Sequence, residues 1–232
     1  MVRAVFFDVG NTLLFPYPGV AEVCREVFSA AGHCRDLADI EQLMPLVDDF
    51  YEDAYSRDDT FWTDEDRTSD LWVGMYSLLA RKLGIEDDAT MLAEAVYEEF
   101  GDPSRWMAYA DVAPAFERLR ERGLALGIIS NWDRRLESIL AGLGLTDMLD
   151  SVVSSAAVGL HKPDPRIFEH ACASLGVAAC EAVHVGDHHY ADVLGARAAG
   201  MQPVLIDRHG VHDPAVALDS LDTLEVRLGW VA

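Results

Sequence analysis

The apolar and polar positions of the chain follow two different patterns. Residues 2–8 form a short apolar run rich in valine and phenylalanine, which predicts a buried strand. From about residue 17 to residue 106 the apolar positions recur with helical spacing, and Gly32, Gly84 and Gly101 stand where helices should end. No strand pattern is evident in that stretch, so it predicts an all-helical insert of four or five helices.

Beyond residue 108 the pattern alternates between helix and strand. Helical spacing at 112–123, 134–145, 164–176 and 190–200 is interleaved with short apolar runs at 124–130, 149–155, 181–187 and 202–206. This order predicts parallel βαβ units, with helices on both faces of one sheet. The predicted fold is therefore α/β: a doubly wound, Rossmann-like core from residues 1–15 and 108–232, with an inserted helical cap at 16–107.

Composition narrows the class of protein. Half of the 232 residues are apolar, which is enough for a sizeable core. No apolar run approaches the length of a membrane span, and Asp8 interrupts the first run, so we expect a cytoplasmic protein with no membrane partner. The cysteines form no CxxC pair, which favours reduced, mostly buried thiols over a zinc site; they are Cys24, Cys34, Cys172 and Cys180.

The formal net charge of −22 argues against nucleic acid as a partner, because such a surface repels polyanions. An anionic substrate would need local positive charge at its binding site. Lysine is scarce: Lys82 and Lys162 are the only two in the sequence. A lysine that lies among other polar residues is therefore a candidate for that positive charge.

Polar residues follow four successive predicted strands. Ligands of open parallel sheets bind at the carboxyl ends of the strands, so we expect these residues to converge there. Taken singly, each could be a turn, a helix cap or a surface residue. The residues in chain order are Asp8, Ser130, Asn131, Lys162, Asp187 and Asp192.

This combination of side chains suits phosphoryl transfer. Asp8 and Asp187 can hold Mg²⁺, which prefers oxygen ligands, and Asp8 can attack phosphorus to form an aspartyl-phosphate. Ser130, the adjacent backbone amides and Lys162 can neutralise the phosphoryl oxygens. Asp192 can orient Lys162 or a metal-bound water.

Four segments of the chain resemble the ordered motifs of the haloacid dehalogenase-like hydrolase superfamily. They are "FFDVGNTLL", "IISN", the lysine in "HKPDPRIF" and "GDHHYAD". The helical insert resembles the C1 cap of subfamily I. The segments "ISNWDRRLESILAGLGL" and "KPDPRIF" look like the branch called haloacid dehalogenase-like hydrolase domain-containing protein three.

The resemblance implies a mobile cap, a Mg²⁺ cofactor and a small phosphorylated substrate. The implied catalytic residues are Asp8 and Lys162, and the implied metal ligands are Asp8, Gly10 and Asp187, with Asp192 in support. The implied substrate-binding residues are Asn11, Thr12, Ser130, Asn131 and Lys162. We expect a monomer or a homodimer.

The chain departs from the family at Gly10. Phosphatases of the family carry a second aspartate there, which protonates the leaving group and later activates water. Gly10 keeps a backbone carbonyl for the metal but has no proton to give. General acid–base catalysis is typically worth roughly 10²–10⁴-fold, so we expect weak or narrow activity that favours good leaving groups.

Three alternatives to a phosphatase remain. A 2-haloacid dehalogenase would also use Asp8 and lack the second aspartate, but Asp187 fits it poorly and Arg25 is an unconvincing partner within a cap helix. A phosphonatase would need Lys82, which is expected to be an exposed surface lysine. The fold could also serve as a catalytically inert binding module.

Overall fold

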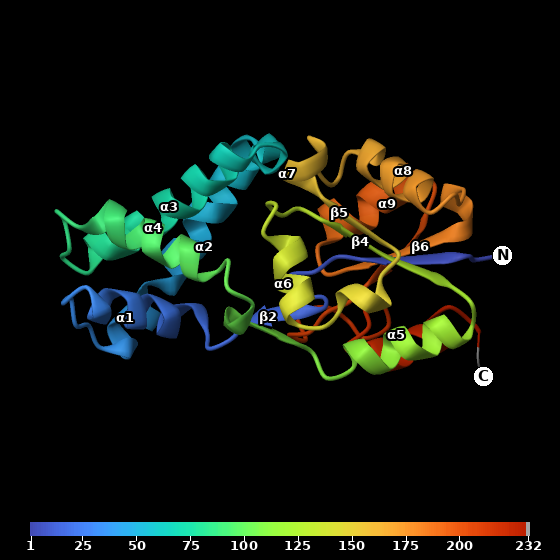
Figure 1. Cartoon of the computed structure of the whole chain (residues 1–232), viewed down its shortest axis with the longest axis horizontal. Helices are drawn as coiled ribbons and strands as arrows, with labels where there is room; N and C mark the ends of the chain where they lie inside the picture. Colours follow the sequence, from blue (N-terminus) through green and yellow to red (C-terminus); the bar gives the residue numbers. More distant parts are fainter. Residues whose placement is uncertain (231–232) are drawn as a thin grey trace. The chain divides into compact units, whose positions relative to one another are not determined.

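The computed structural model describes residues 1–230 and divides the chain into two compact units. We call the unit made of Met1–Phe15 and the chain from Ala108 onward the core unit. The second unit, Pro16–Met107, is here the helical unit. Figure 1 shows the core unit with its strands and the helical unit with its long helices.

The core unit is built on one sheet of five parallel strands. Their order across the sheet is β5 (Ser151–Ser154), β4 (Ala125–Ser130), β1 (Ala4–Phe7), β6 (Ala182–Gly186) and β7 (Gln202–Leu205). At the end of β1, Phe7 pairs with Ile128 on one side and Val185 on the other. Every residue of β1 is buried, as expected for a central strand covered on both faces. The predicted α/β class with a parallel sheet is confirmed.

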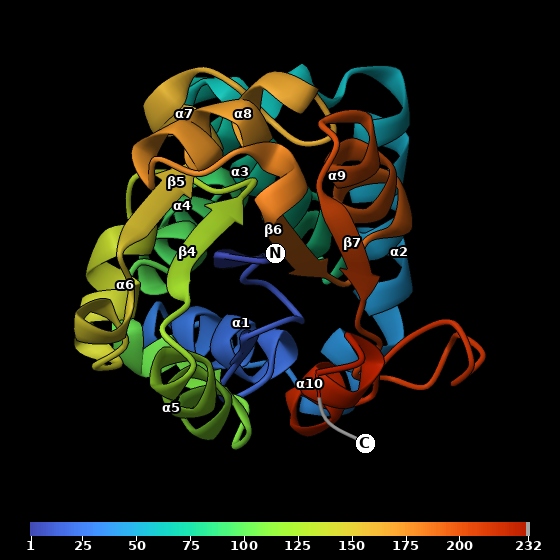
Figure 2. The same ribbon diagram turned by 90° about the vertical axis from the view of Figure 1, so that its right-hand side faces the viewer.

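Helices cover both faces of this sheet. Phe6 packs in the cluster that includes residues of α8 (Pro165–Ser174) and α9 (Gly195–Ala198), whereas Phe7 contacts Phe116 of α5 (Val112–Glu121) with ring centroids 5.1 Å apart. Figure 2 shows α8 and α9 on one side of the strands and α5 on the other. The shorter helices α6 (Leu136–Gly142), α7 (Ser155–Val158) and α10 (Leu224–Arg227) complete this unit.

Within residues 16–107, all of which are described, the helical unit contains four α-helices, in line with the prediction of four or five. They are α1 (Val20–Ala30), α2 (Leu37–Arg57), α3 (Glu65–Lys82) and α4 (Ala89–Glu99). Their apolar faces meet in a separate core around Phe28, Ile40, Leu79 and Leu92. Gly32 and Gly84 have φ of 90° and 77°, a left-handed conformation that suits glycine just after a helix.

Two short strands at the junction of the units were missed. The strand β2 (Leu14–Pro16) pairs with β3 (Trp106–Ala108) in a two-stranded sheet, so the expectation of no strand in this part was wrong at its edges. Three residues are too few for an alternating pattern to stand out. Neighbouring hydrogen bonds extend this pairing, with the Tyr109 amide donating to the Leu13 carbonyl at 3.0 Å.

The expected helix at 190–200 also differs in detail. It begins as a π-helix over His189–Leu194 and only then continues as α9. Single π-turns are rare and often occur at functional sites. The wider turn cannot be read from apolar spacing alone.

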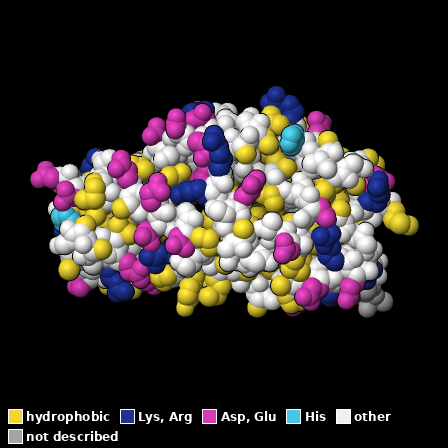
Figure 3. Space-filling view, viewed as in Figure 1, with side chains coloured by type: hydrophobic (Ala, Val, Ile, Leu, Met, Phe, Trp, Pro, Cys, Tyr) yellow, Lys and Arg dark blue, Asp and Glu magenta, His cyan; other side chains and the backbone are white. Residues whose placement is uncertain are grey.

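The cysteines are divided between the interior and the surface. Cys24 and Cys172 are buried, but Cys34 and Cys180 are exposed, so the thiols are not mostly buried as expected. Among the described residues, none of the helices has the length and hydropathy required to cross a bilayer. On the face in Figure 3, acidic side chains are spread among basic ones rather than gathered in one place.

Candidate active site

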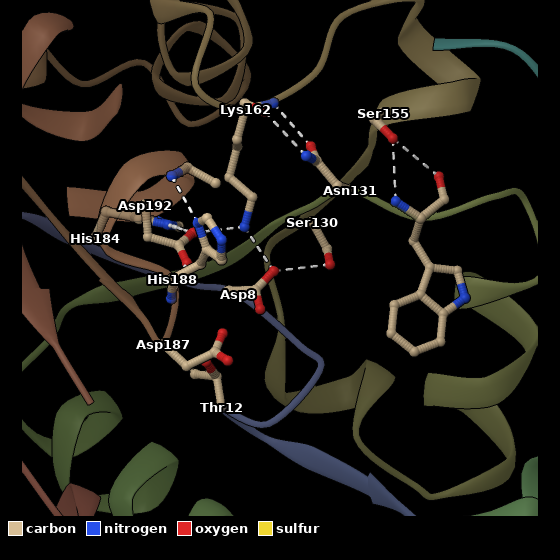
Figure 4. Close-up of polar contacts among 12 residues, drawn as sticks. Asp8, Thr12, Ser130, Asn131, Ser155, Lys162, His184, Asp187, His188 and Asp192 are labelled. Carbon is tan, nitrogen blue, oxygen red and sulfur yellow. Dashed lines mark hydrogen bonds and ion pairs between the residues drawn. The ribbon is translucent and has the colours of Figure 1, made fainter. Parts of the chain in front are cut away.

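The polar residues predicted to converge do meet at the carboxyl ends of the strands. Asp8 follows β1, Ser130 ends β4, and Asp187 follows β6. Figure 4 shows these side chains gathered with Lys162, which comes from the loop before α8. One carboxylate oxygen from each of Asp8, Asp187 and Asp192 lies within 4.8 Å of the others.

Asp8 is held by two donors on a single oxygen. Lys162 Nζ donates to Asp8 Oδ1 at 2.6 Å, and Ser130 Oγ donates to the same oxygen at 2.9 Å. Within the described part of the chain, Asp8 Oδ2 makes no side-chain hydrogen bond. The carboxylate is therefore fixed in orientation while one oxygen remains available for a metal or for attack on a substrate.

Lys162 is a fully enclosed cation. Its side chain is 2% exposed, and its Nζ also donates to Asp192 Oδ1 at 2.6 Å. Burial acts to lower the pKa of Lys162, but the charges of Asp192 and Asp8 outweigh it and raise that pKa above its ordinary value. The ammonium group therefore remains charged beside the nucleophile candidate.

Asn131 binds the backbone of the loop that carries Lys162. Its Oδ1 accepts from the Lys162 amide at 2.7 Å, and its Nδ2 donates to the Lys162 carbonyl at 3.0 Å. The side chain thus holds the backbone of the lysine loop, and both of its polar atoms are engaged there. The Asn131 side chain therefore positions Lys162, and the substrate contact expected of Asn131 stays a prediction.

Asp192 is a buried carboxylate that binds Lys162 and two further donors. Its Oδ1 also accepts from His184 Nε2 at 2.8 Å, and its Oδ2 accepts from the His188 amide at 3.0 Å. Burial raises the pKa of Asp192, but Lys162 and His184 outweigh burial and bring that pKa well below its usual range. Asp192 is therefore an ionised support for Lys162, which makes it unsuitable as a proton donor.

His184 is a member of the site that sequence reasoning missed. It lies within β6 with no exposed surface, and burial lowers its pKa despite the pull of Asp192. Since a carboxylate only accepts, Nε2 carries the proton toward Asp192. Within the described residues, Nδ1 is buried without a hydrogen-bond partner. The only signal in the sequence is a histidine inside an otherwise apolar strand two residues before the "GD" pair.

Gly186 leaves space for the side chain of Asp192. A Cβ at Gly186 would lie 2.2 Å from Asp192 Cγ, a distance that no side chain can accommodate without movement. The glycine of the "GD" pair is therefore required by the packing of Asp192 against the strand end.

Asp187 supplies the third carboxylate, and the site is short of positive charge. Burial raises its pKa to about 8, and the like charges of Asp8 and Asp192 add to this effect. Asp187 has one contact from Thr12 Oγ1 at 3.5 Å, whereas Lys162 is the only cationic side chain bonded to the cluster among the described residues. Three carboxylates facing one cation form a donor set that a divalent ion would neutralise.

The loop after Asp8 contains the remaining predicted residues. Asn11 is exposed and has φ of 52°, and Thr12 is buried beside Asp187. Within the described chain, no backbone amide donates to the Gly10 carbonyl, so this oxygen is available to a metal. A Cβ at Gly10 would make only an ordinary contact, 3.6 Å from Trp132 Cζ3. Unlike Gly186, Gly10 is not required by packing.

Arg208 is a second residue that the sequence did not reveal. Its Nη2 donates to the Thr12 carbonyl at 2.8 Å, and Nη1 and Nη2 bind the Asp111 carboxylate at 2.6 and 3.0 Å. The guanidinium also lies 4.2 Å from the centre of the Tyr109 ring. Arg208 therefore anchors the loop that presents Thr12 to Asp187.

Comparisons with known proteins show which proteins this chain is similar to. A family model described as haloacid dehalogenase-like hydrolase matches residues 2–200. Haloacid dehalogenase-like hydrolase domain-containing protein 3 of Danio rerio is 34% identical, over 98% of this chain and 96% of that protein. This is the branch that the motifs in the second half predict.

Two further proteins bear on the reaction. Glyceraldehyde 3-phosphate phosphatase of Methanopyrus kandleri is 32% identical, over 92% of this chain and 87% of that protein. The solved structure of 2-haloacid dehalogenase from Pseudomonas syringae pv. Tomato DC3000 is 25% identical, covers 100% of both chains and has a TM-score of 0.66. Sequence identity and similarity of fold therefore do not distinguish a phosphatase reaction from a dehalogenase reaction.

Proposed function

Because the chain belongs to the haloacid dehalogenase-like hydrolase family and is a hydrolase, we propose that it is a Mg²⁺-dependent phosphatase acting on small phosphorylated molecules through Asp8. One observation carries the proposal. Asp8 and Asp187 lie in a cluster of three carboxylates whose only bonded cation, among the described residues, is Lys162. Such a cluster is suited to a divalent cation and, with that cation, to an anionic substrate.

In the proposed reaction, an oxygen of Asp8 attacks phosphorus while the bond from phosphorus to the leaving oxygen breaks. The leaving oxygen takes both electrons, and the phosphoryl group remains on Asp8 until water hydrolyses it. Lys162 and Ser130 both donate to Asp8 Oδ1, and in this proposal they would hold the phosphoryl oxygens during transfer. Asp192 and Asn131 keep Lys162 in position from its side chain and its backbone, respectively.

Asp8, Asp187 and the Gly10 carbonyl would hold the metal ion. When bound, Mg²⁺ supplies positive charge that offsets the repulsion between the carboxylates and the incoming phosphate. The charge on Lys162 alone does not balance the three carboxylates.

Gly10 limits the range of good substrates. Without a side-chain acid, the leaving oxygen must depart as an anion, and roughly 10²–10⁴-fold of rate is absent for poor leaving groups. We propose activity that is weak for simple alkyl phosphates and better for acyl or aryl phosphates. The helical unit is proposed to act as the cap that chooses among them.

A 2-haloacid dehalogenase is the second candidate, favoured by Gly10 and by the similar solved dehalogenase. In that reaction Asp8 would attack carbon and displace halide without any metal. Asp187 argues against it, because a reaction without metal gives no role to a further carboxyl group beside Asp8, where burial and the neighbouring carboxylates raise its pKa to about 8.

The experiment is a hydrolysis assay with p-nitrophenyl phosphate and 2-chloropropionate, each in Mg²⁺ and in EDTA. We expect slow Mg²⁺-dependent release of p-nitrophenol and no release of chloride. Asp8→Asn should reduce turnover to background, and Gly10→Asp should raise it. Gly10→Ala is the matched control, because it adds volume without the carboxylate and should not reproduce the gain.

Two results would contradict the proposal. Chloride release that persists in EDTA would assign the dehalogenase reaction instead. Full turnover of p-nitrophenyl phosphate by Asp8→Asn would remove Asp8 from the role of nucleophile.

A further inference from the structure

We propose that Trp132 is a specificity-determining residue whose indole ring contacts a planar, conjugated leaving group, so that aryl phosphates are the preferred substrate class. This inference rests on the proposed phosphatase function. Trp132 lies next to Gly10, the position at which the family's phosphatases carry the acid–base aspartate.

The first support is the position of the indole relative to Gly10. A Cβ at Gly10 would lie 3.6 Å from Trp132 Cζ3. Among described atoms outside residues 9–11, Cζ3 is the only heavy atom within 4 Å of that position. The space in which a side chain at residue 10 would extend is therefore bordered by an aromatic edge, two residues from Asp8.

The second support is the anchoring of Trp132. Its amide donates to Ser155 Oγ at 3.0 Å, and its carbonyl accepts from Ser155 Oγ at 3.2 Å and from the Ala156 amide at 3.2 Å. Ser155 is fully buried, and Figure 4 shows its two contacts with the neighbouring backbone. Trp132 itself is partly exposed. A ring held by a fixed backbone with part of its surface available loses little entropy when it contacts a ligand.

The third support is that Gly10 and Trp132 favour the same chemistry. With no acid at residue 10, the bond from phosphorus to oxygen must break without protonation of the leaving oxygen. Both electrons then leave with that oxygen, and an aryl group accepts them because its ring delocalises the negative charge. The same flat ring can pack on an indole in an edge or offset arrangement, which is worth about 0.5–1.5 kcal/mol beyond its buried area.

The test compares two substrates that both have good leaving groups but differ in shape. The p-nitrophenyl group is aromatic, whereas the acetyl group of acetyl phosphate is small and has no ring. For each variant, in Mg²⁺, the measured quantity is kcat/KM for p-nitrophenyl phosphate divided by kcat/KM for acetyl phosphate. This ratio does not depend on the fraction of protein that is folded.

We expect Trp132→Ala to lower the ratio by about 2- to 12-fold, the factor that corresponds to an aromatic contact. Trp132→Phe retains a ring and should keep most of the ratio. Trp230→Ala is the matched control, because Trp230 stacks with Arg122 near the end of the described chain, with Arg122 Cζ 5.8 Å from the ring centre. That variant should leave the ratio at the wild-type value.

The outcomes distinguish the two proposals. If Trp132→Ala lowers both rates equally, or Trp132→Phe behaves like Trp132→Ala, the inference about Trp132 is wrong and the phosphatase proposal stands. If the wild type hydrolyses neither substrate with Mg²⁺, the phosphatase proposal is wrong and the inference about Trp132 falls with it.

Discussion

Replacing Asp187 by asparagine should stabilise the metal-free protein while abolishing its response to Mg²⁺. The raised pKa of Asp187, about 8 against an ordinary value of 3.8, means that the folded protein must bind a proton which the unfolded chain lacks. The free energy of unfolding therefore falls as the pH rises from about 4 to about 8, and then levels off. Asparagine is neutral in both states and escapes this cost.

The size of the effect follows from the same shift. At pH 7 the solution is about three units above the ordinary pKa, and each unit corresponds to about 1.36 kcal/mol, which gives about 4 kcal/mol. Asp187 is partly exposed, so water screens part of this energy. We therefore expect Asp187→Asn to gain about 2–4 kcal/mol in EDTA at pH 7.

The assay is urea unfolding followed by circular dichroism at pH 4, 6 and 8, in EDTA and in Mg²⁺. The difference in the free energy of unfolding between Asp187→Asn and the wild type should vanish near pH 4. Mg²⁺ should stabilise the wild type but not Asp187→Asn. Asp133→Asn is a matched control, because Asp133 is buried but paired with Arg135 at 2.7 Å. That variant should be destabilised with or without metal. If Asp187→Asn is less stable than the wild type in EDTA at pH 8, then Asp187 does not destabilise the metal-free protein.

Substitutions at three further residues test the supports of the site. Gly186→Ala should push the Asp192 carboxylate away from Lys162, costing about 1–3 kcal/mol in urea unfolding and most of the turnover; full activity would contradict the packing argument. His184→Leu should lower Mg²⁺ affinity or activity about 10- to 100-fold in a metal titration, and His184→Gln, which can still donate, should recover part of it. Arg208→Lys should cost about 1–3 kcal/mol in thermal unfolding, and an unchanged midpoint would contradict its anchoring role.

The fold was predictable because its main signals are local. The apolar run before Asp8 and the later helix–strand alternation each report which faces of an element are buried, and βαβ connections leave few topologies for such an order. The pairing of Leu14–Pro16 with Trp106–Ala108 was missed because each strand has three residues. The π-helix at His189–Leu194 was missed because hydrogen-bond spacing leaves no mark on the apolar pattern.

Only those site residues that stand at the ends of predicted strands could be placed together from the sequence. Asp8, Ser130 and Asp187 converge because parallel strands place their carboxyl ends at one edge. Arg208 contacts a carbonyl 196 residues away, and no pattern in the sequence relates two such positions. His184 looks like an ordinary core residue until Asp192 is seen beside it.

In the proposed reaction, Asp8 carries the phosphoryl group in a Mg²⁺-dependent step. The most direct measurement is to mix the enzyme with acetyl phosphate, quench within the first turnover, reduce the acyl phosphate with borohydride and map the modified residue by peptide mass spectrometry. We expect conversion of Asp8 to homoserine in Mg²⁺, with none in EDTA. Modification at another carboxylate, or equal modification of Asp8 in EDTA, would contradict it.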